Sequence, residues 1–428
     1  MEIRQAPDNA VERRWDDMKL PIARFLALAL ALIAAPVERV GAAETQGVVK
    51  IGGMCDRTGA VKNIGLEYCA GVADYLALVN RRGGVLGHRL EYTEIDHAYM
   101  VDRAIDGYEQ LKRDGAMTIM SFGVPVLIAL TPRYMADRIP VFNSGTGLGD
   151  AIDGEAWPYI FPGTASYWSQ GGVVMKYLKD NGAKKGTKIA YLYFDNPAGR
   201  DGIAMVEAVA QKEGYVVRKF AVQPPGLEVG RQVNEIAADF KPDWVVASLF
   251  GKSPAVAIKE FRRANFPLNR VISFVWGAGN VDVEEAGWDV AQGYLGLQYA
   301  ALGRNPPVIR DIIQMYRDQG KEAPKYLGSA YYNRGALHGA LIAEGIRLAI
   351  LNHGMPVTPD KVRKGYEAIR NFDAQGLGPS LTITSKDHEG GGYLRVYQVK
   401  GTEWVPVSGW MRDYRDEVMA LVKKANTK

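Results

Sequence analysis

Residues 188–213, KIAYLYFDNPAGRDGIAMVEAVAQKE, contain the pattern that decides the fold. The run from Lys188 to Tyr193 is short and apolar, as in a buried strand. The loop at 195–199 contains Asn, Pro and Gly, and the stretch from Gly202 to Glu213 places apolar residues at helical spacing. A strand that leads through a short loop into a helix is the first half of a βαβ unit.

The same alternation continues on both sides of this stretch. Strands are predicted at 48–51, 90–95, 118–120, 140–142, 188–193, 215–222, 244–249 and 271–275. Helices are predicted between them, at 66–78, 101–111, 127–136, 170–178, 202–213, 232–239 and 255–264. Strands that alternate with helices of this length form parallel sheets covered on both faces. The pattern therefore predicts an α/β fold with two doubly wound parallel sheets.

The last third of the chain has a different pattern. Helices are predicted at 308–319, 329–351 and 359–370, and strands at 380–384, 393–399 and 404–407. The last two strands form a hairpin through Lys400 and Gly401. This order fits a chain that returns to the first lobe near residue 299.

The N-terminus has the pattern of a secretory signal peptide. The uncharged apolar run at 25–36 follows Lys19 and Arg24, and small residues at 41–43 follow the run. The run is shorter than the about 20 residues of a membrane-spanning helix. We expect residues 1–43 to be removed, with translation starting at Met1 or Met18; a buried core helix is the alternative. No Cys lies directly after the run, so no lipid anchor is expected there.

Length and charge limit what the chain after residue 43 can be. The about 385 residues after position 43 exceed what one hydrophobic core usually organises, which predicts two lobes. The net charge is +4 and the basic residues are scattered, so nucleic acid binding is not expected. No second long apolar stretch follows position 43, so insertion of the mature chain in a membrane is not expected either. The two cysteines, Cys55 and Cys69, form a disulfide in an oxidising compartment or remain buried thiols; the sequence leaves both open.

Motifs for catalysis are missing from the sequence. The five histidines are far apart, and none has a second His or Cys at metal-ligand spacing. There is no Gly-x-Ser-x-Gly elbow and no Walker phosphate loop. The glycines at 145–149 have the wrong spacing for a dinucleotide fingerprint. We expect a protein that is not an enzyme and that uses no cofactor or metal.

Six loops rich in small, hydroxyl and aromatic residues follow the ends of predicted strands. They are 55–59, 121–123, 144–147, 195–199, 250–253 and 276–279. Ligands of parallel α/β sheets bind outside the carboxyl ends of the strands. Several of these loops precede helices, whose free N–H groups suit an anionic ligand. Each loop alone is an ordinary turn, but six together indicate a binding site.

The chain resembles the substrate-binding proteins of ABC transporters of the branched-chain amino-acid type, with the leucine/isoleucine/valine-binding fold. The matching segments are Ile51-Gly52-Gly53, Thr58-Gly59, Gly65, Asn80 to Gly87, Ser121-Phe122-Gly123, Ile139-Pro140-Val141, Tyr159-Ile160-Phe161, Asp195 to Gly199, Tyr331-Tyr332-Asn333 and Asp387 to Gly391. They extend over nearly all of residues 47–410. Each segment is weak alone, whereas their order and spacing are specific.

The resemblance implies a type I periplasmic binding protein, in which two lobes joined by three hinge crossings close on a small ligand. The crossings are expected near 162–164, 297–300 and 391–394. We expect an N-terminal lobe of 46–163 and 299–391, a C-terminal lobe of 164–298 and 392–415, and a tail of 416–428. The predicted ligand-binding residues are Arg57, Ile64, Ser121, Phe122, Gly123, Gly145, Thr146, Gly147, Asn196, Ala198, Phe250, Trp276 and Tyr331.

Two positions depart from the amino-acid binders that the chain resembles. Trp276 stands where those proteins carry a Glu that pairs with the α-ammonium, and Ala198 stands where they carry a Tyr. An indole is only a donor, so it leaves a buried ammonium without a counter-charge. Both departures favour an acid without an amine. Ser121 and residues 145–147 match positions that hold the ligand's polar groups, and Arg57 is an alternative partner for a carboxylate.

Four aromatic residues suggest the shape of the ligand. Phe122, Phe250, Trp276 and Tyr331 would form a flat apolar slot, which favours an aromatic or similarly apolar acid. The expected function is delivery of this acid to permease subunits of an ABC importer in the periplasm. The alternatives are a branched-chain or other amino-acid binder, a ligand-binding sensor of the same fold, and a hydrolase that uses the crevice.

Overall fold

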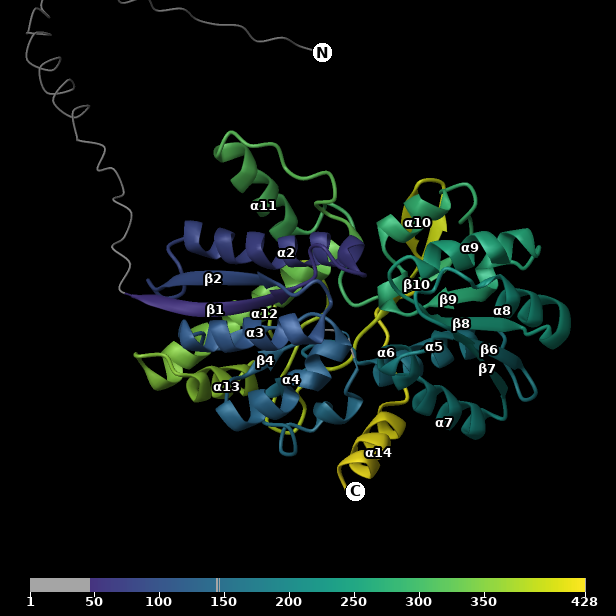
Figure 1. Cartoon of the computed structure of the whole chain (residues 1–428), viewed down its shortest axis with the longest axis horizontal. Helices are drawn as coiled ribbons and strands as arrows, with labels where there is room; N and C mark the ends of the chain where they lie inside the picture. The colour runs from purple at the N-terminus through teal and green to yellow at the C-terminus, as the bar shows by residue number, and fades with distance from the viewer. Residues whose placement is uncertain (1–46, 144, 146, 428) are drawn as a thin grey trace, which may run out of the picture. The chain divides into compact units, whose positions relative to one another are not determined.

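The computed structural model describes residues 47–143, 145 and 147–427. The predicted signal peptide and both candidate start positions lie outside these residues. The described chain contains two separate β-sheets, each flanked by helices (Figure 1). The predicted α/β fold with two doubly wound, mainly parallel sheets is confirmed.

The first sheet is entirely parallel and has the strand order β2-β1-β3-β4-β5. Its strands are β1 (Val48–Cys55), β2 (Arg89–Asp96), β3 (Thr118–Met120), β4 (Val141–Phe142) and β5 (Ile160–Phe161). Ile51 pairs with Tyr92 on one side and with Thr118 on the other. The carboxyl ends of these strands therefore lie at one edge of the sheet.

The second sheet has the order β12-β11-β10-β9-β8-β6-β7. Its strands are β6 (Lys188–Phe194), β7 (Val216–Val222), β8 (Trp244–Ser248), β9 (Val271–Ser273), β10 (Leu295–Gln298), β11 (Arg395–Lys400) and β12 (Glu403–Pro406). The five strands from β7 to β10 run parallel, and β11 and β12 add the predicted antiparallel hairpin. β8 is buried throughout, as its continuous apolar sequence predicts.

Helices cover both faces of each sheet. Those associated with the first sheet are α2 (Lys62–Arg81), α3 (Val101–Arg113), α4 (Val124–Asp137), η2 (Gly149–Ile152), α11 (Pro307–Asp318), α12 (Ala330–His353) and α13 (Pro359–Glu367). Those associated with the second are α5 (Tyr167–Asp180), α6 (Pro197–Asp201), α7 (Ile203–Glu213), α8 (Gly230–Asn234), η3 (Glu235–Phe240), α9 (Ser253–Arg263), η4 (Leu268–Arg270), η5 (Val275–Gly277) and α10 (Asn280–Ala286).

The return of the chain to the first half depends on the packing of α12 against α2. At this crossing a Cβ on Gly71 would lie 2.1 Å from the Tyr332 carbonyl oxygen, and one on Gly335 would lie 1.9 Å from that of Tyr68. Only glycine permits such a close backbone approach. The chain passes between the two halves three times in all: between β5 and α5, between β10 and α11, and between α13 and β11.

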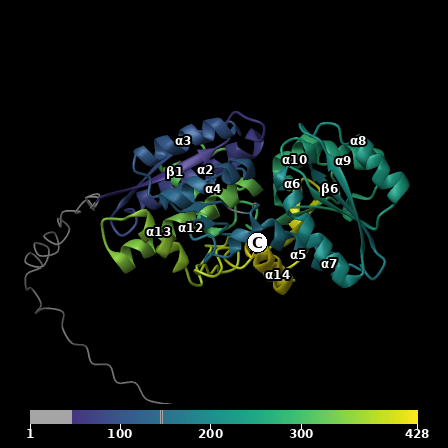
Figure 2. The same cartoon turned by 60° about the horizontal axis from the view of Figure 1, so that its bottom comes forward.

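Two segments differ from their prediction. Residues 380–384, expected to be a strand, make only isolated bridges, Phe372 with Leu381 and Thr384 with Asp387, because they lie in the connection between the two halves. Residues expected to form a C-terminal tail instead belong to helix α14 (Arg415–Asn426). This helix packs against α5, α7 and η2, beside the label C in Figure 2. The lobe boundaries themselves stay a prediction.

No helix in the described ranges combines the length and the apolar composition that a membrane crossing requires.

Candidate functional site

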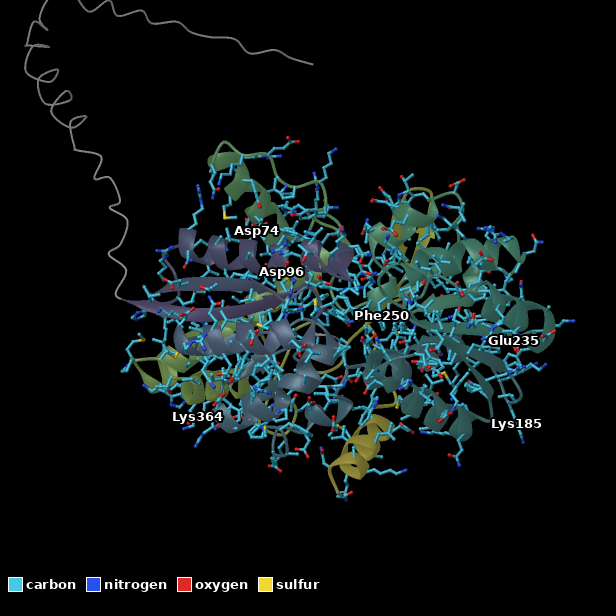
Figure 3. The ribbon with its side chains drawn as sticks, in the orientation of Figure 1. Asp74, Asp96, Lys185, Glu235, Phe250 and Lys364 are labelled. Carbon is cyan, nitrogen blue, oxygen red and sulfur yellow. A yellow bond between two sulfur atoms is a disulfide. The ribbon has the colours of Figure 1, made fainter. Side chains whose placement is uncertain are left out.

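A small pocket lies where loops from both sheets meet. Its lining comes from the first half through Val61, Ile64, Tyr99, Phe122, Gly123 and Val124, and from the second half through Tyr167, Ala198, Phe250 and Trp276. Most of these residues follow the carboxyl ends of parallel strands, where α/β sheets bind ligands. Figure 3 labels Phe250 where the two halves meet. The pocket has about 30 Å³ of free space.

Aromatic rings fill much of this region. The ring of Phe122 meets the indole of Trp276 edge to face, with 5.9 Å between centroids. Tyr68 packs behind both rings, at 5.5 Å from Phe122 and 5.6 Å from Trp276. On the other side of the pocket, Phe250 contacts Phe194 at 4.9 Å. The wall is therefore apolar and built from rings that support one another.

The polar groups of the pocket are two tyrosine hydroxyls and a helix start. Neither the Tyr99 nor the Tyr167 hydroxyl makes a hydrogen bond to another described residue, although Tyr167 is only 2% exposed. Burial raises the pKa of both phenols, so both stay protonated and able to donate. Gly123 caps α4 and Val124 is its first residue, so the N–H groups of these two residues have no partner within the helix. Among the described lining residues none carries a charge.

His97 holds two residues of the pocket wall. Its Nδ1 accepts a hydrogen bond from the Tyr99 N–H at 2.9 Å, so its Nε2 carries the proton and donates to the Phe122 carbonyl oxygen at 3.1 Å. Burial lowers the pKa of His97 and keeps the imidazole neutral. This histidine is therefore a positioning residue that ties the loop after β2 to the loop after β3.

The indole of Trp276 is engaged by the opposite half. Its Nε1 donates to the carbonyl oxygen of Gly145 at 2.8 Å. Gln170 donates to the same carbonyl at 3.2 Å and accepts from the Val275 N–H at 3.2 Å. The indole nitrogen is thus occupied by protein, and Trp276 presents an apolar ring to the pocket.

A buried polar cluster supports Trp276 from behind. Tyr331 stacks on the indole at 5.8 Å, and its hydroxyl lies 2.5 Å from Oδ2 of Asp282. The guanidinium of Arg334 lies 5.4 Å from the indole and donates to the Val275 carbonyl oxygen at 2.6 Å. Burial raises the pKa of Asp282 to about 7 and that of nearby Glu67 to about 7. This cluster is structural support, because none of its members lines the pocket.

Six of the predicted ligand-binding residues line the pocket: Ile64, Phe122, Gly123, Ala198, Phe250 and Trp276. Four others are not in its described lining, although Asn196 lines the larger hollow beside it. The Ser121 N–H donates to the Phe142 carbonyl at 2.9 Å, and Gly145 offers its carbonyl to Trp276. Asn196 caps α6 by accepting from the Gly199 N–H, and Tyr331 lies behind Trp276.

The remaining three predicted residues have separate outcomes. Arg57 points away from the lining and forms an ion pair with Glu94, with 2.7 Å between Nε and Oε1. Gly147 is buried near Val124, where a Cβ would lie 3.1 Å from that side chain. Thr146 lies outside the described residues. The binding role of every predicted residue stays a prediction.

Sequence reasoning missed Val61, Tyr99, Val124 and Tyr167 in the lining. Tyr99 was detectable, because it follows β2 at the same sheet edge as the six predicted loops. Tyr167 follows Ser166, whose side chain caps α5 by accepting from the Ser169 N–H. Both residues come from positions that strand and helix boundaries alone could have indicated.

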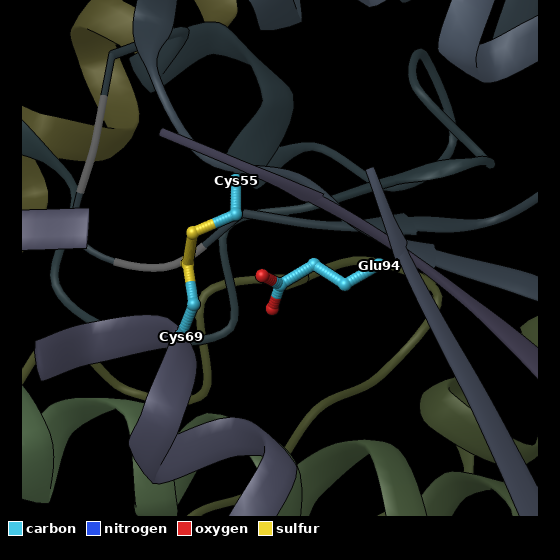
Figure 4. A group of neighbouring side chains, drawn as sticks. All are labelled: Cys55, Cys69 and Glu94. Carbon is cyan, nitrogen blue, oxygen red and sulfur yellow. A yellow bond between two sulfur atoms is a disulfide. The ribbon is translucent and has the colours of Figure 1, made fainter. Parts of the chain in front are cut away.

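Cys55 and Cys69 form a disulfide that joins the end of β1 to α2, with Glu94 beside it (Figure 4). The two thiols are therefore not free, which settles the alternative that the sequence left open. A bonded sulfur pair offers no thiolate to a metal, and the Glu94 carboxylate is already engaged by Arg57. These three side chains therefore have a structural role and do not form a metal site.

Comparison with known proteins identifies similar chains. The family model described as periplasmic binding protein matches residues 48–403. A solved structure described as an ABC transporter permease from the Pseudomonas fluorescens group is 31% identical, with a TM-score of 0.81, and the match covers 90% of this chain and 96% of that one. No curated protein sequence matches the chain.

Two further solved structures share the fold at lower identity. One is described as a branched-chain amino-acid ABC transporter from Thermus thermophilus with bound valine; it is 22% identical, with a TM-score of 0.76 over 89% of this chain and 99% of that one. The other is described as a fatty acid ABC transporter substrate-binding protein from Thermomonospora curvata; it is 19% identical, with a TM-score of 0.75 over 88% and 95%.

Proposed function

The chain belongs to the periplasmic binding protein family, and from that premise we propose that it captures a small organic acid and delivers it to the permease of an ABC importer. The family match over residues 48–403 supports a binding role. The disulfide between Cys55 and Cys69 fits the oxidising periplasm in which we place the protein. Closure of the two halves around the ligand would provide the capture step.

The composition of the pocket carries the proposal on ligand class. Among the described lining residues there is no carboxylate to pair with an α-ammonium. A buried ammonium without a counter-charge costs several kcal/mol. The Trp276 indole does not change this, because it is a donor and already bonds to Gly145. A zwitterionic amino acid such as the valine of the Thermus thermophilus structure is therefore disfavoured.

A carboxylate without an amine fits the same lining. It would accept hydrogen bonds from the unpartnered hydroxyls of Tyr99 and Tyr167 and from the N–H groups of Gly123 and Val124 at the start of α4. Each bond to a charged acceptor contributes about 1.5–3 kcal/mol. The rings of Phe122, Phe250 and Trp276 would contact the apolar part of the acid.

A thermal-shift screen of carboxylic acids, their amides, and leucine and valine tests this proposal. A ligand at 100 times its dissociation constant stabilises the protein by about 2.7 kcal/mol. We expect acids to raise Tm and the matching amides to have no effect. A rise in Tm with leucine or valine but with none of the acids would refute the proposed ligand class. If the purified protein converted the bound acid to a product, the proposal that it only binds its ligand would be refuted.

A matched pair of variants on α5 locates the carboxylate. Tyr167→Phe removes one unpartnered hydroxyl from the pocket and should weaken acid binding by about ten- to 150-fold. Tyr177→Phe is the control, because Tyr177 is on the same helix but packs against Trp244, away from the pocket. Equal affinities in the two variants would mean that the carboxylate does not reach Tyr167.

A further inference from the structure

A second and larger hollow adjoins the inner pocket. It has about 430 Å³ of free space and shares three lining residues with the inner pocket: Val61, Tyr99 and Phe250. The inner pocket and the outer hollow meet at these three residues. The outer hollow continues from this boundary to Phe194, Pro224 and Leu227 in the second half.

The lining of the outer hollow is apolar where it meets the inner pocket. Phe194 and Phe250 pack together with 4.9 Å between their centroids. Leu227 is 51% exposed on the loop between β7 and α8, although burial of a leucine is favourable by about 1.5–3 kcal/mol. An exposed leucine beside two packed rings and a proline forms an apolar surface that a ligand would cover.

The volumes of the two spaces suit different parts of a ligand. A cavity of about 150 Å³ holds one benzene ring, and one of roughly 10–15 Å³ holds one water molecule. The inner pocket, with about 30 Å³, has room for a group the size of a carboxylate, whereas the outer hollow, with about 430 Å³, has room for a ring or an alkyl chain.

We propose that the ligand is an elongated acid whose carboxylate lies in the inner pocket and whose apolar body passes between Val61, Tyr99 and Phe250 into the outer hollow. This inference rests on the proposed function and deepens it, because it names the ligand's shape. Compact acids lack the body that would cover Phe194 and Leu227. The favoured class is a carboxylic acid with an apolar group several methylenes from the carboxylate.

A chain-length series measures the contribution of the outer hollow. Benzoate, 3-phenylpropanoate and 5-phenylpentanoate would be titrated calorimetrically into the full-length mature protein. Each methylene that becomes buried should raise the affinity about fourfold. We expect 5-phenylpentanoate to bind most tightly and benzoate to bind weakly.

Two exposed leucines provide a matched pair of variants. Leu227→Asp should reduce the affinity for 5-phenylpentanoate by at least tenfold and leave that for benzoate unchanged. Leu351→Asp changes another exposed leucine, at the end of α12 and outside both spaces, and should alter neither affinity. Thermal unfolding of each variant checks that its fold is intact.

A third pair of variants tests the orientation of the acid. Lys252 is the charged residue in the described lining of the outer hollow, and Lys185 is an exposed lysine of the same half at its far edge (Figure 3). With the carboxylate inside, Lys252→Gln and Lys185→Gln should bind 5-phenylpentanoate equally. A large loss with Lys252→Gln alone would place the carboxylate outside and overturn the proposed orientation.

The outcomes separate this inference from the proposed function. If the acids bind with no dependence on chain length, or Leu227→Asp affects every acid equally, the outer subsite is wrong while the acid-binding function stands. If none of a wider set of acids binds, the proposed function fails and the outer subsite fails with it.

Discussion

The indole nitrogen of Trp276 donates a hydrogen bond of 2.8 Å to the carbonyl oxygen of Gly145, and the two residues belong to loops of different sheets. Trp276 lies in η5 after β9, and Gly145 follows β4. Because Trp276 also lines the inner pocket, the same side chain contacts the ligand space and holds the two halves together. We therefore expect binding and closure to be coupled through this residue.

Removal of this hydrogen bond should weaken ligand binding. Trp276→Phe keeps an aromatic ring but loses the donor, which costs about 0.5–1.5 kcal/mol, or roughly two- to tenfold in affinity. Calorimetric titration of an acid identified in the screen measures the change.

A second tryptophan is the control for this prediction. Trp404 is also buried, but its indole nitrogen makes no hydrogen bond to another described residue, so Trp404→Phe removes no such bond. If Trp276→Phe binds as tightly as Trp404→Phe, the contact with Gly145 does not contribute to closure.

Reduction of the Cys55–Cys69 disulfide should destabilise the protein. A disulfide that closes a loop of about 15 residues stabilises by about 3 kcal/mol, and these cysteines are 14 residues apart. Chemical unfolding with and without reductant should therefore differ by about 2–4 kcal/mol. A Cys55→Ala/Cys69→Ala variant should show no response to reductant, and free thiols in the untreated, denatured protein would contradict the bond.

Asp282 should destabilise the protein as the pH rises. Burial raises its pKa from the ordinary value of 3.8 to about 7, so the folded protein binds more protons than the unfolded chain between these values. The free energy of unfolding therefore falls as the pH rises through this window. Asp282→Asn removes the charge and should be more stable than the original protein by about 1–3 kcal/mol at pH 8, with little difference at pH 4.

Denaturant unfolding across pH 4–8 measures this effect. Glu322→Gln is the control, because Glu322 is an exposed carboxylate in the connection before α12. A pH profile of Asp282→Asn that runs parallel to that of Glu322→Gln would show that Asp282 does not titrate in this window.

His97 should act in the opposite direction. Its pKa is lowered below the ordinary value of 6.5 by burial, so the unfolded chain binds more protons once the pH falls below 6.5. The free energy of unfolding then decreases with acidification. His97→Gln should reduce this acid sensitivity, and the loss of its two bonds to Tyr99 and Phe122 should cost about 1–2 kcal/mol at pH 8.

The comparison with a second buried histidine isolates this effect. Burial lowers the pKa of His338 to about 3, so it contributes acid sensitivity of the same sign, but it lies outside the pocket lining. His97→Gln should change both the pH profile and acid binding, whereas His338→Gln, which reaches the pocket wall only through the hydroxyl of Tyr68, should change the pH profile and affect acid binding less. Unchanged acid binding in His97→Gln would show that it does not position the pocket wall.

Local patterns were sufficient for the fold class and for most of the strands and helices. The apolar run at 188–193 became β6, and the helical spacing at 202–213 became α7, because burial of an apolar face is expressed in the spacing of neighbouring residues. The segment 380–384 misled the same reasoning, since β-rich composition does not show whether a partner strand is within reach.

The sequence by itself determined the two sheets and the sheet edges at which loops gather, because strand and helix periodicity is local; the three passages between the sheets came from the resemblance to a known family. Only the tertiary structure decided what those loops do. Arg57 pairs with Glu94, 37 residues away, and Trp276 bonds to Gly145, 131 residues away. Such pairings depend on how separate elements pack, and no local pattern records which distant partner neutralises a charge or occupies a donor.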